Sequence, residues 1–280
     1  MAFEVLLDGL AFPEGPRWHD GRLWFSDMYD HWVLAVDLRG RAERIVEVPN
    51  QPSGLGWLPD GRMLVVSMLD RRLLRLERDR RLTEVANLSA VVRSQCNDMV
   101  VDDLGRAYIG NFGFDFAAGE PASPTDLVMI DADGSVRVVA DGLIFPNGSV
   151  ITPDRRNLIV AETFASCLTA FDVEPDGGLA RRRAFAQLDG TTPDGICLDA
   201  EGAVWFASPG GNEVIRVREG GTITDRISTD GLSAFACMLG GVDRRTLFVC
   251  VSDWTGPKTT RTRPGRILMV SVETPGAGLP

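Results

Sequence analysis

Short apolar runs separated by turn residues recur along the whole chain. Each copy has an apolar run, a turn built on D-G, D-D-x-G or D-R-R, and then a run of β-branched and aromatic residues. Turn chemistry between two such runs is typical of a β-hairpin. The copies are "PEGPRWHDGRLWFSD" (13–27), "PSGLGWLPDGRMLVVSM" (52–68), "CNDMVVDDLGRAYIGN" (96–111), "PNGSVITPDRRNLIVAE" (146–162), "PDGICLDAEGAVWFAS" (193–208) and the weaker "ACMLGGVDRRTLFVCVSD" (236–253).

Further apolar runs complete each unit. A third run follows each hairpin, as at 32–38, and a fourth often comes next, as at 41–48. Successive copies begin 39 to 50 residues apart. Six units of four strands predict an all-β, six-bladed β-propeller that spans 1–280 as one domain. No stretch has a helical period, which argues against a parallel α/β fold.

The strand predicted at 3–7, "FEVLL", has no unit of its own. An isolated strand at the start of a propeller leaves one blade incomplete and one edge exposed. We therefore expect this strand to pair as the outer strand of blade six and to close the ring.

Composition narrows the class of protein. The 280 residues are 44% hydrophobic and 24% charged, which is typical of a globular chain. The net charge of −10 argues against a nucleic-acid partner, because such a partner requires a basic face. No apolar run is long enough to cross a membrane, and "MAFEVLLDGLAF" lacks the basic start of a signal peptide.

The cysteines show no disulfide framework. Five of them are scattered without a C-x-x-C pair, which predicts reduced thiols in a cytoplasmic protein. Several lie in apolar runs, where a thiol acts as a small core side chain. They are Cys96, Cys167, Cys197, Cys237 and Cys250.

Polar residues occupy one phase of the repeat, at the start of each predicted inner strand. Inner strands of a propeller begin near the central axis, so these side chains are expected to converge there. Two carboxylates and two amides would form an all-oxygen cluster suited to Ca²⁺ or Mg²⁺, or with fewer ligands to Mn²⁺ or Zn²⁺. The alternative is that the Asn-Gly and Asp-Gly pairs are ordinary turns. The residues at this phase are Glu14, Ser53, Asn97, Asn147, Asp194 and Cys237.

At these residues the chain resembles a known family. "PEGPRW", "ND" before "VDDLGR", "FPNG" before "TPD", and "TPDGICLDAEGAVW" are similar to motifs of the regucalcin (senescence marker protein)/gluconolactonase family of calcium- or zinc-dependent lactone hydrolases. The resemblance runs from Glu14 to about Val251. It implies a six-bladed propeller, one divalent metal ion and a lactone or related ester as substrate.

The resemblance also implies roles for individual residues. Glu14, Asn147 and Asp194 match the direct metal ligands of the family, and Asp194 would also be the general base or would orient the attacking water. Asn97 matches a pocket asparagine that binds substrate or reaches the metal. Sugar-lactone members often have an arginine two residues before this asparagine. Here that residue is Gln95, which argues against a simple sugar lactone.

Loops after each second strand are expected to surround the pocket. His31 lies in one of these loops, where it either lines the pocket or lies on the surface. Aromatic residues in the loops favour a fairly apolar substrate; the alternative is that they cap the ends of blades. These aromatics are Tyr29, Trp32, Phe112, Phe114, Phe116, Phe164 and Trp254.

Other chemistries remain open at this stage. No G-x-S-x-G motif is present and no histidine can be assigned as a partner, which disfavours a Ser-His-Asp hydrolase. The same propeller and metal would serve phosphotriester hydrolysis or another ring-opening step. A non-catalytic calcium- or ligand-binding propeller is the alternative from a different class.

Overall fold

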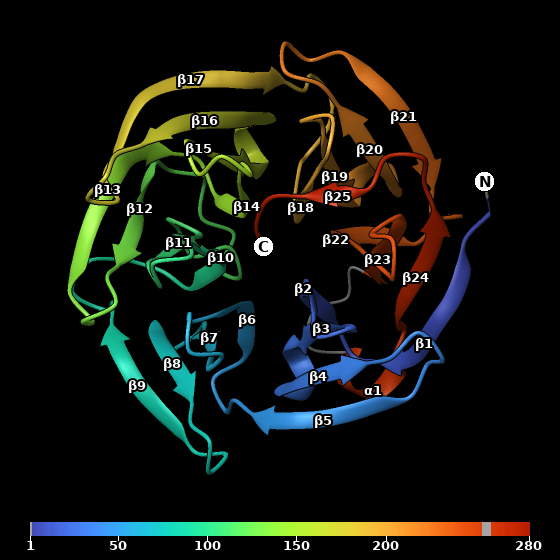
Figure 1. Ribbon diagram of the computed structural model, residues 1–280, viewed down its shortest axis with the longest axis horizontal. Coiled ribbons are helices and arrows are strands. Elements are labelled where there is room, and N and C mark those ends of the chain that lie inside the picture. The colour runs from blue at the N-terminus through green and yellow to red at the C-terminus, as the bar shows by residue number, and fades with distance from the viewer. Residues whose placement is uncertain (1, 254–258) are drawn as a thin grey trace.

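The strands form six antiparallel sheets around a central axis, as the computed structural model shows for residues 2–253 and 259–280 (Figure 1). Within the first four sheets the strands follow one another in chain order from the axis to the rim, and the fifth sheet keeps this order with one later strand beside its innermost strand. This arrangement confirms the predicted six-bladed β-propeller.

The blades use strands of four to nine residues. Blades one to three are β2 (Pro13–His19), β3 (Arg22–Asp27), β4 (Trp32–Val36) and β5 (Ala42–Glu47); β6 (Pro52–Trp57), β7 (Met63–Ser67), β8 (Arg72–Leu76) and β9 (Leu82–Asn87); and β10 (Cys96–Val101), β11 (Ala107–Asn111), β12 (Thr125–Ile130) and β13 (Val136–Leu143). Blades four to six are β14 (Pro146–Ile151), β15 (Asn157–Glu162), β16 (Cys167–Val173) and β17 (Leu179–Gln187); β18 (Ile196–Asp199), β19 (Val204–Ser208), β20 (Glu213–Val217) and β21 (Ile223–Ser228); and β22 (Ser233–Gly240), β23 (Thr246–Ser252) and β24 (Gly265–Ser271) with β1 (Glu4–Leu10).

The helical elements are short and lie between strands. They are the single 3₁₀ turns η1 (Met28–Asp30), η2 (Thr163–Ala165) and η3 (Pro209–Gly211), and the α-helix α1 (Thr259–Thr262).

The N-terminal strand closes the ring. β1 pairs antiparallel with β24, from Glu4 opposite Met269 to Leu10 opposite Gly265. In Figure 1 the blue β1 lies alongside the red β24 at the rim. The prediction that the first strand completes blade six is therefore confirmed, and no blade lacks its outer strand.

The C-terminal segment adds a contact that the sequence analysis did not predict. The short strand β25 (Gly276–Ala277) pairs with the inner strand β18, placing Ala277 opposite Leu198. Leu279 then forms an isolated bridge with Ile151 at the end of β14. A pairing of two residues within a Gly- and Pro-rich segment leaves no alternating pattern to detect.

The hydrophobic core lies mainly between neighbouring blades. Leu64 and Val66 of blade two pack in one cluster with Met99 and Ile109 of blade three. Similar clusters join the other neighbouring blades. Because each sheet buries its faces against its neighbours, the ring is rigid and can hold side chains at the axis in fixed positions.

A β-bulge near the start of the inner strand recurs in most blades. A bulge inserts an unpaired residue and turns its side chain away from the ordinary alternation. The pairing register shifts at Glu14/Arg17, Pro52/Leu55, Cys96/Met99 and Pro146/Ser149. These shifts coincide with the polar phase of the repeat.

Blade six departs from the expected alignment. Its register shift falls between Ala234 and Ala236, so the bulged residue is Phe235. Cys237 lies two residues further along β22 and pairs with Val249 in regular register. The alignment of the weakest copy was therefore displaced by two residues, because that copy has no proline before its bulge.

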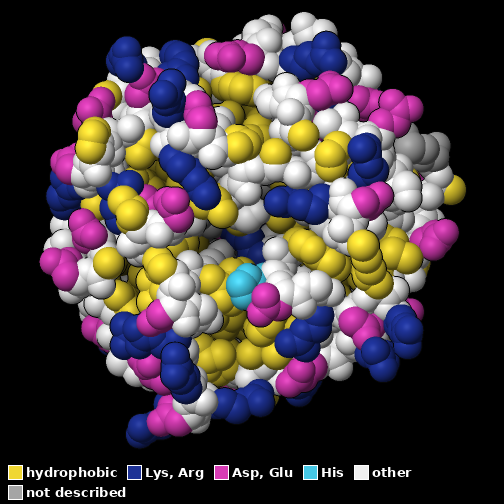
Figure 2. All heavy atoms as spheres, in the orientation of Figure 1, with side chains coloured by type: hydrophobic (Ala, Val, Ile, Leu, Met, Phe, Trp, Pro, Cys, Tyr) yellow, Lys and Arg dark blue, Asp and Glu magenta, His cyan; other side chains and the backbone are white. Residues whose placement is uncertain are grey.

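Surface charge, helix length and the state of the cysteines bear on the class of protein. On the face drawn in Figure 2, Lys and Arg alternate with Asp and Glu around the periphery, and hydrophobic side chains gather nearer the middle. That face has no broad basic area. No helix among the described residues has the length and hydrophobicity needed to cross a bilayer. All five cysteines are free thiols.

Candidate active site

Three of the predicted site residues meet where blades three, four and five approach the axis. Asn97 Nδ2 donates to the Pro146 carbonyl at 3.3 Å, which joins β10 to β14. Asn147 Nδ2 donates to Asp194 Oδ1, which joins blade four to blade five. The three side chains are at most 7% exposed. The starts of three neighbouring inner strands therefore place them in one buried group, with Asn97 and Asn147 in bulges and Asp194 just before β18.

The two amides keep their oxygens available. Asn147 Nδ2 also donates to Thr163 Oγ1 at 3.2 Å. Among the described residues, neither Asn97 Oδ1 nor Asn147 Oδ1 accepts a hydrogen bond. An amide whose nitrogen is held by acceptors presents its carbonyl oxygen as a lone-pair donor. Both amides are thus oriented as oxygen ligands.

Glu14 adds a carboxylate that lies in a low-dielectric enclosure. It is partly exposed, and its Oε2 accepts the Gly15 N–H at 2.8 Å. Burial raises the pKa of Glu14 to about 8; the Gly15 N–H lowers it, the negative charge of Asp98 raises it further, and the Arg17 guanidinium opposes that rise. Carboxylates that lack a counter-charge resist ionisation in this way.

Asp194 experiences the same kind of enclosure. Its backbone N–H donates to the Ala207 carbonyl at 3.0 Å, which anchors the residue just before β18. Burial raises the pKa of Asp194 well above its ordinary value, and the charges of Glu14 and Asp98 raise it further. The two carboxyl groups thus disfavour each other's ionisation.

The donor set fits a hard divalent cation. It consists of two carboxylates with excess negative charge and two amide oxygens without hydrogen-bond donors, and Ca²⁺ and Mg²⁺ prefer oxygen ligands of these kinds. A dication would neutralise the repulsion between Glu14 and Asp194. Within residues 2–253 and 259–280, no group of three or more His, Cys, Asp or Glu side chains forms a conventional metal site. The mixed set of acids and amides is the candidate metal centre.

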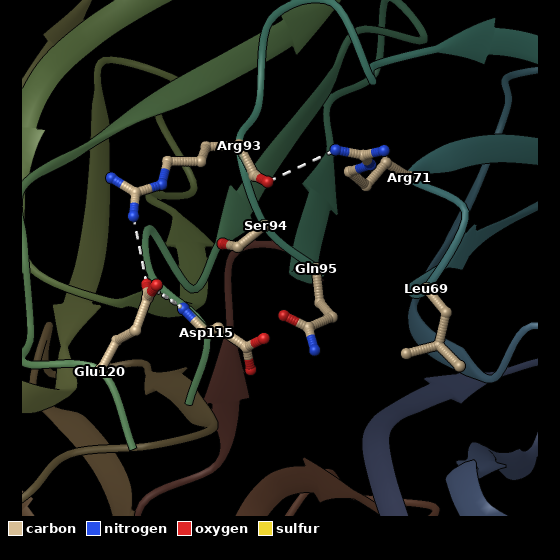
Figure 3. A pocket seen from close by; sticks show the side chains of 7 residues that line it. All are labelled: Leu69, Arg71, Arg93, Ser94, Gln95, Asp115 and Glu120. Carbon is tan, nitrogen blue, oxygen red and sulfur yellow. Dashed lines mark hydrogen bonds and ion pairs between the residues drawn. The ribbon is translucent and has the colours of Figure 1, made fainter. Parts of the chain in front are cut away.

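A cavity of about 360 Å³ opens on the face where the inner strands begin. Gln95 lines it two residues before Asn97, and Figure 3 shows Gln95 and Asp115 pointing into the open space between them. Arg93 donates to Glu120 Oε2 at 3.1 Å, so this pair is internally neutralised. The lining residues are Leu69, Arg71, Arg93, Ser94, Gln95, Asp115 and Glu120.

Two polar groups of this cavity have no protein partner. Ser94 Oγ is buried without a hydrogen bond. The Gln95 amide makes none with the described residues, and Arg71 Nη1 reaches only backbone carbonyls, at 3.4 Å. Unpaired buried polar groups are rare and indicate a missing partner, either water or ligand. Gln95 is half-buried, so water can satisfy its amide, whereas the Ser94 hydroxyl lacks a partner that a water or a ligand would supply.

The predicted aromatic rim forms a cluster of its own. The Phe114 ring lies 5.8 Å from Phe145 and 5.7 Å from Phe164 and is 3% exposed. Phe164 is 43% exposed, and it packs against Phe145 at 5.0 Å. These rings mainly contact one another where the loops of blades three and four meet, so Phe114 shapes a loop and Phe164 offers a partly open face.

One further predicted residue, His31, lies elsewhere. His31 follows η1 in a left-handed conformation, and its Nδ1 lies 2.8 Å from the Pro49 carbonyl. That contact holds His31 against the connection between blades one and two. Trp254 lies outside the described residues.

Sequence reasoning missed the pair formed by Arg17 and Asp98. Arg17 Nη2 donates to Asp98 Oδ1 at 2.6 Å, and both residues are buried. They lie within the quoted motifs "PEGPRW" and "ND", next to the predicted ligands. The opposite charges of the two residues are compatible with an ion pair, but 81 residues separate them in the chain, so no local pattern indicates that they meet.

Comparison with known proteins supports a common ancestry. Residues 12–253 match the model of the SMP-30/gluconolactonase/LRE-like region. Pentonolactonase XacC from Haloferax volcanii is 29% identical over 260 residues, which cover 87% of this chain and 82% of that protein. A 6-deoxy-6-sulfogluconolactonase from Pseudomonas putida is 27% identical over 251 residues, covering 85% and 82% of the two chains.

The fold is also similar to solved structures. A calcium-binding protein, regucalcin, from Agrobacterium tumefaciens superposes with a TM-score of 0.83 at 22% identity. The match covers 100% of this chain and 96% of that chain. At this identity the likeness concerns the arrangement of blades.

Proposed function

The chain belongs to the SMP-30/gluconolactonase/LRE-like family, and from this premise we propose that it hydrolyses lactones with a divalent cation held by Glu14, Asn147 and Asp194. Two relatives that align over more than four fifths of this chain are named as lactonases. The observation that carries the metal dependence is the buried group of Asn97, Asn147 and Asp194 at the starts of neighbouring inner strands, with the amide nitrogens bonded and the amide oxygens left without donors among the described residues.

The chemistry requires an electrophile, a water and a base. A dication bound by these oxygens would polarise the lactone carbonyl, stabilise the developing oxyanion and keep both carboxylates ionised. Asp194 accepts a proton from water as the water oxygen attacks the carbonyl carbon. The ring C–O bond then breaks, and the proton passes to the leaving oxygen to give the hydroxy acid. Asn97 orients the substrate at the same edge of the site.

The cavity beside Gln95 supports a substrate with hydroxyl substituents. The sequence analysis expected a less polar lactone, on the basis of loop aromatics and the absence of an arginine at position 95. The rings of Phe112, Phe114 and Phe116 instead pack together with Phe145. The side chains that line the cavity near Asn97 include polar groups: the Ser94 hydroxyl has no hydrogen-bond partner, and the Gln95 amide faces the cavity.

The test uses metal-stripped protein and a pH-indicator assay. Ca²⁺, Mg²⁺, Mn²⁺ or Zn²⁺ is returned separately, with polyhydroxy lactones and alkyl lactones of equal ring size as substrates. We expect turnover that depends on the added metal and favours the polyhydroxy series. Ion binding without turnover of any lactone would overturn the hydrolase and leave an ion-binding propeller. Faster turnover of the alkyl lactones would instead support the less polar substrate expected from the sequence.

A further inference from the structure

A buried ion pair adjoins the candidate metal centre. Arg17 lies on β2 three residues after Glu14 and is 3% exposed. Asp98 directly follows Asn97 on β10, and its Oδ1 accepts from Arg17 Nη2 at 2.6 Å and from the Met99 N–H at 2.8 Å. Each member of the pair is thus connected through its own strand to a site residue.

Asp98 occupies a position that other blades leave without a side chain. In four other blades the residue after the site position is a glycine. A Cβ added at Gly54 would lie 2.4 Å from the Met99 nitrogen, and one at Gly148 would lie 2.5 Å from the Ile196 nitrogen. In those blades, the backbone of the neighbouring blade fills the space that a side chain would occupy. Blade three alone places a carboxylate at this level of the axis. The four glycines are Gly15, Gly54, Gly148 and Gly195.

Arg17 is held in one orientation by three strands. Its Nε donates to the Leu55 carbonyl of β6 at 3.0 Å, and its Nη2 donates to the Met99 carbonyl of β10 at 2.6 Å. Its Nη1 donates to the Pro16 carbonyl of its own strand at 2.8 Å. The planar guanidinium fork suits several acceptors at once, and a lysine lacks that geometry.

The pair sets the charge near the candidate metal centre. Glu14 lies on the same strand as Arg17, Asp98 is bonded to Arg17, and Asp194 is bonded to Asn147, so the starts of the inner strands bring three carboxylates toward the axis. The negative charge of Asp98 also raises the pKa of the other two. Arg17 supplies the one described cation that acts on Glu14. With Arg17 in place, three negative charges and one positive charge leave two net negative charges, which match a dication.

We propose that Arg17 is a positioning residue that neutralises Asp98, so that the site formed by Glu14, Asn147 and Asp194 selects a divalent over a trivalent cation. This role rests on the proposed metal dependence. Replacing Arg17 with methionine leaves Asp98 uncompensated and raises the net charge to three negatives. Replacing Asp98 as well with asparagine returns it to two.

The test is calorimetric titration of Ca²⁺ and Tb³⁺ into the metal-stripped full chain. We expect Arg17→Met to raise the ratio of Tb³⁺ to Ca²⁺ affinity by about tenfold, because one more negative charge favours the trivalent ion. The double variant Arg17→Met/Asp98→Asn should return the ratio to the wild-type value. Asp98→Asn alone leaves one net negative charge and should lower the ratio by about tenfold.

A matched control separates charge from packing. Arg216 and Asp199 form an equally close buried pair, at 2.6 Å, in blade five. Arg216→Met should leave the ratio unchanged. If Arg17→Met and the double variant each lose Ca²⁺ and Tb³⁺ affinity equally, the ratio of the two affinities stays constant. That result would show that Arg17 has only a structural role. If Arg17→Met does not fold, an unchanged ratio in Asp98→Asn overturns the proposal. A wild-type protein that binds neither ion would overturn the metal centre itself.

Discussion

Asn147 donates a hydrogen bond from Nδ2 to Oδ1 of Asp194, and this contact joins the fourth blade to the fifth at the candidate site. The bond fixes the amide so that its oxygen faces away from the acid. Asp194 is the acceptor in this contact. Under the proposed function the two side chains would have complementary roles, with Asn147 as an oxygen ligand and Asp194 as ligand and base.

Asp194→Asn should nearly abolish lactone hydrolysis. Asparagine keeps the shape of the side chain, but it cannot accept a proton from water and it removes one carboxylate from the cation. We expect kcat/KM to fall by roughly 10²–10⁴-fold, measured with the pH-indicator assay at saturating metal. Ser53→Ala is the control, because Ser53 is equally buried at the same phase of the repeat. An Asp194→Asn enzyme within a few-fold of wild type would exclude Asp194 as the base.

The metal-free protein should lose stability as the pH rises. The pKa of Glu14 is raised by burial from 4.5 to about 8 in the folded chain. Between these values the folded state binds more protons than the unfolded state, so the free energy of unfolding falls with increasing pH. We expect the melting temperature without metal to decrease between pH 5 and pH 8. Added Ca²⁺ should raise it more at pH 8, where binding displaces fewer protons.

Glu14→Gln provides the control for this pH effect. Glutamine is neutral at every pH, so the variant should show a smaller decrease over the same range and a smaller response to Ca²⁺. A wild-type protein whose metal-free melting temperature increases from pH 5 to pH 8 would contradict the assigned origin of the shift.

Gln95→Leu should discriminate between substrates. The leucine fills similar space but cannot exchange hydrogen bonds with a hydroxylated lactone in the cavity. We expect KM for polyhydroxy lactones to rise by about tenfold, with little change for alkyl lactones. Arg62→Leu, at a solvent-facing cluster in blade two, is a control for the loss of a polar side chain. Equal effects on both substrate series would show that Gln95 acts only on the shape of the loop.

Leu10→Ala should weaken the closure of the ring. Leu10 is 4% exposed at the end of β1, where it packs in the cluster between blades one, five and six. Truncation of a buried leucine costs about 2–5 kcal/mol, to be measured by urea unfolding. Val5→Ala on the same strand is the control, because Val5 is 52% exposed and should change stability by less than about 0.5 kcal/mol. Similar effects of the two changes would show that β1 contributes little to the core.

The repeat made the blades predictable because turn residues and apolar runs are local features. The same reasoning placed Glu14, Asn147 and Asp194 at one phase, and at Glu14 and Asn147 a bulge of the inner strand turns the side chain out of the ordinary alternation. The sixth copy was misaligned, since a bulge after Ala234 leaves no mark in the sequence. Local patterns reveal a residue's phase, but not which carbonyl or acid it will contact.

The features that escaped prediction all depend on contacts between distant segments. Arg17 and Asp98 come together only when blades one and three surround the same axis. The cavity beside Gln95 is lined by loops of two blades, and its unpaired Ser94 hydroxyl is visible only once those loops are placed. Contacts of this kind follow from the closure of the ring.

The pairing of β1 with β24 also has a consequence for synthesis on the ribosome. Leu10 is made 255 residues before its partner Gly265. At about 5–20 residues per second, the first strand waits on the order of ten to fifty seconds before its partner exists. During that time blades one to five can assemble while β1 presents an unpaired edge. Strand β1 is the segment most open to mispairing during this time, and the synthesis of β24 ends this exposure.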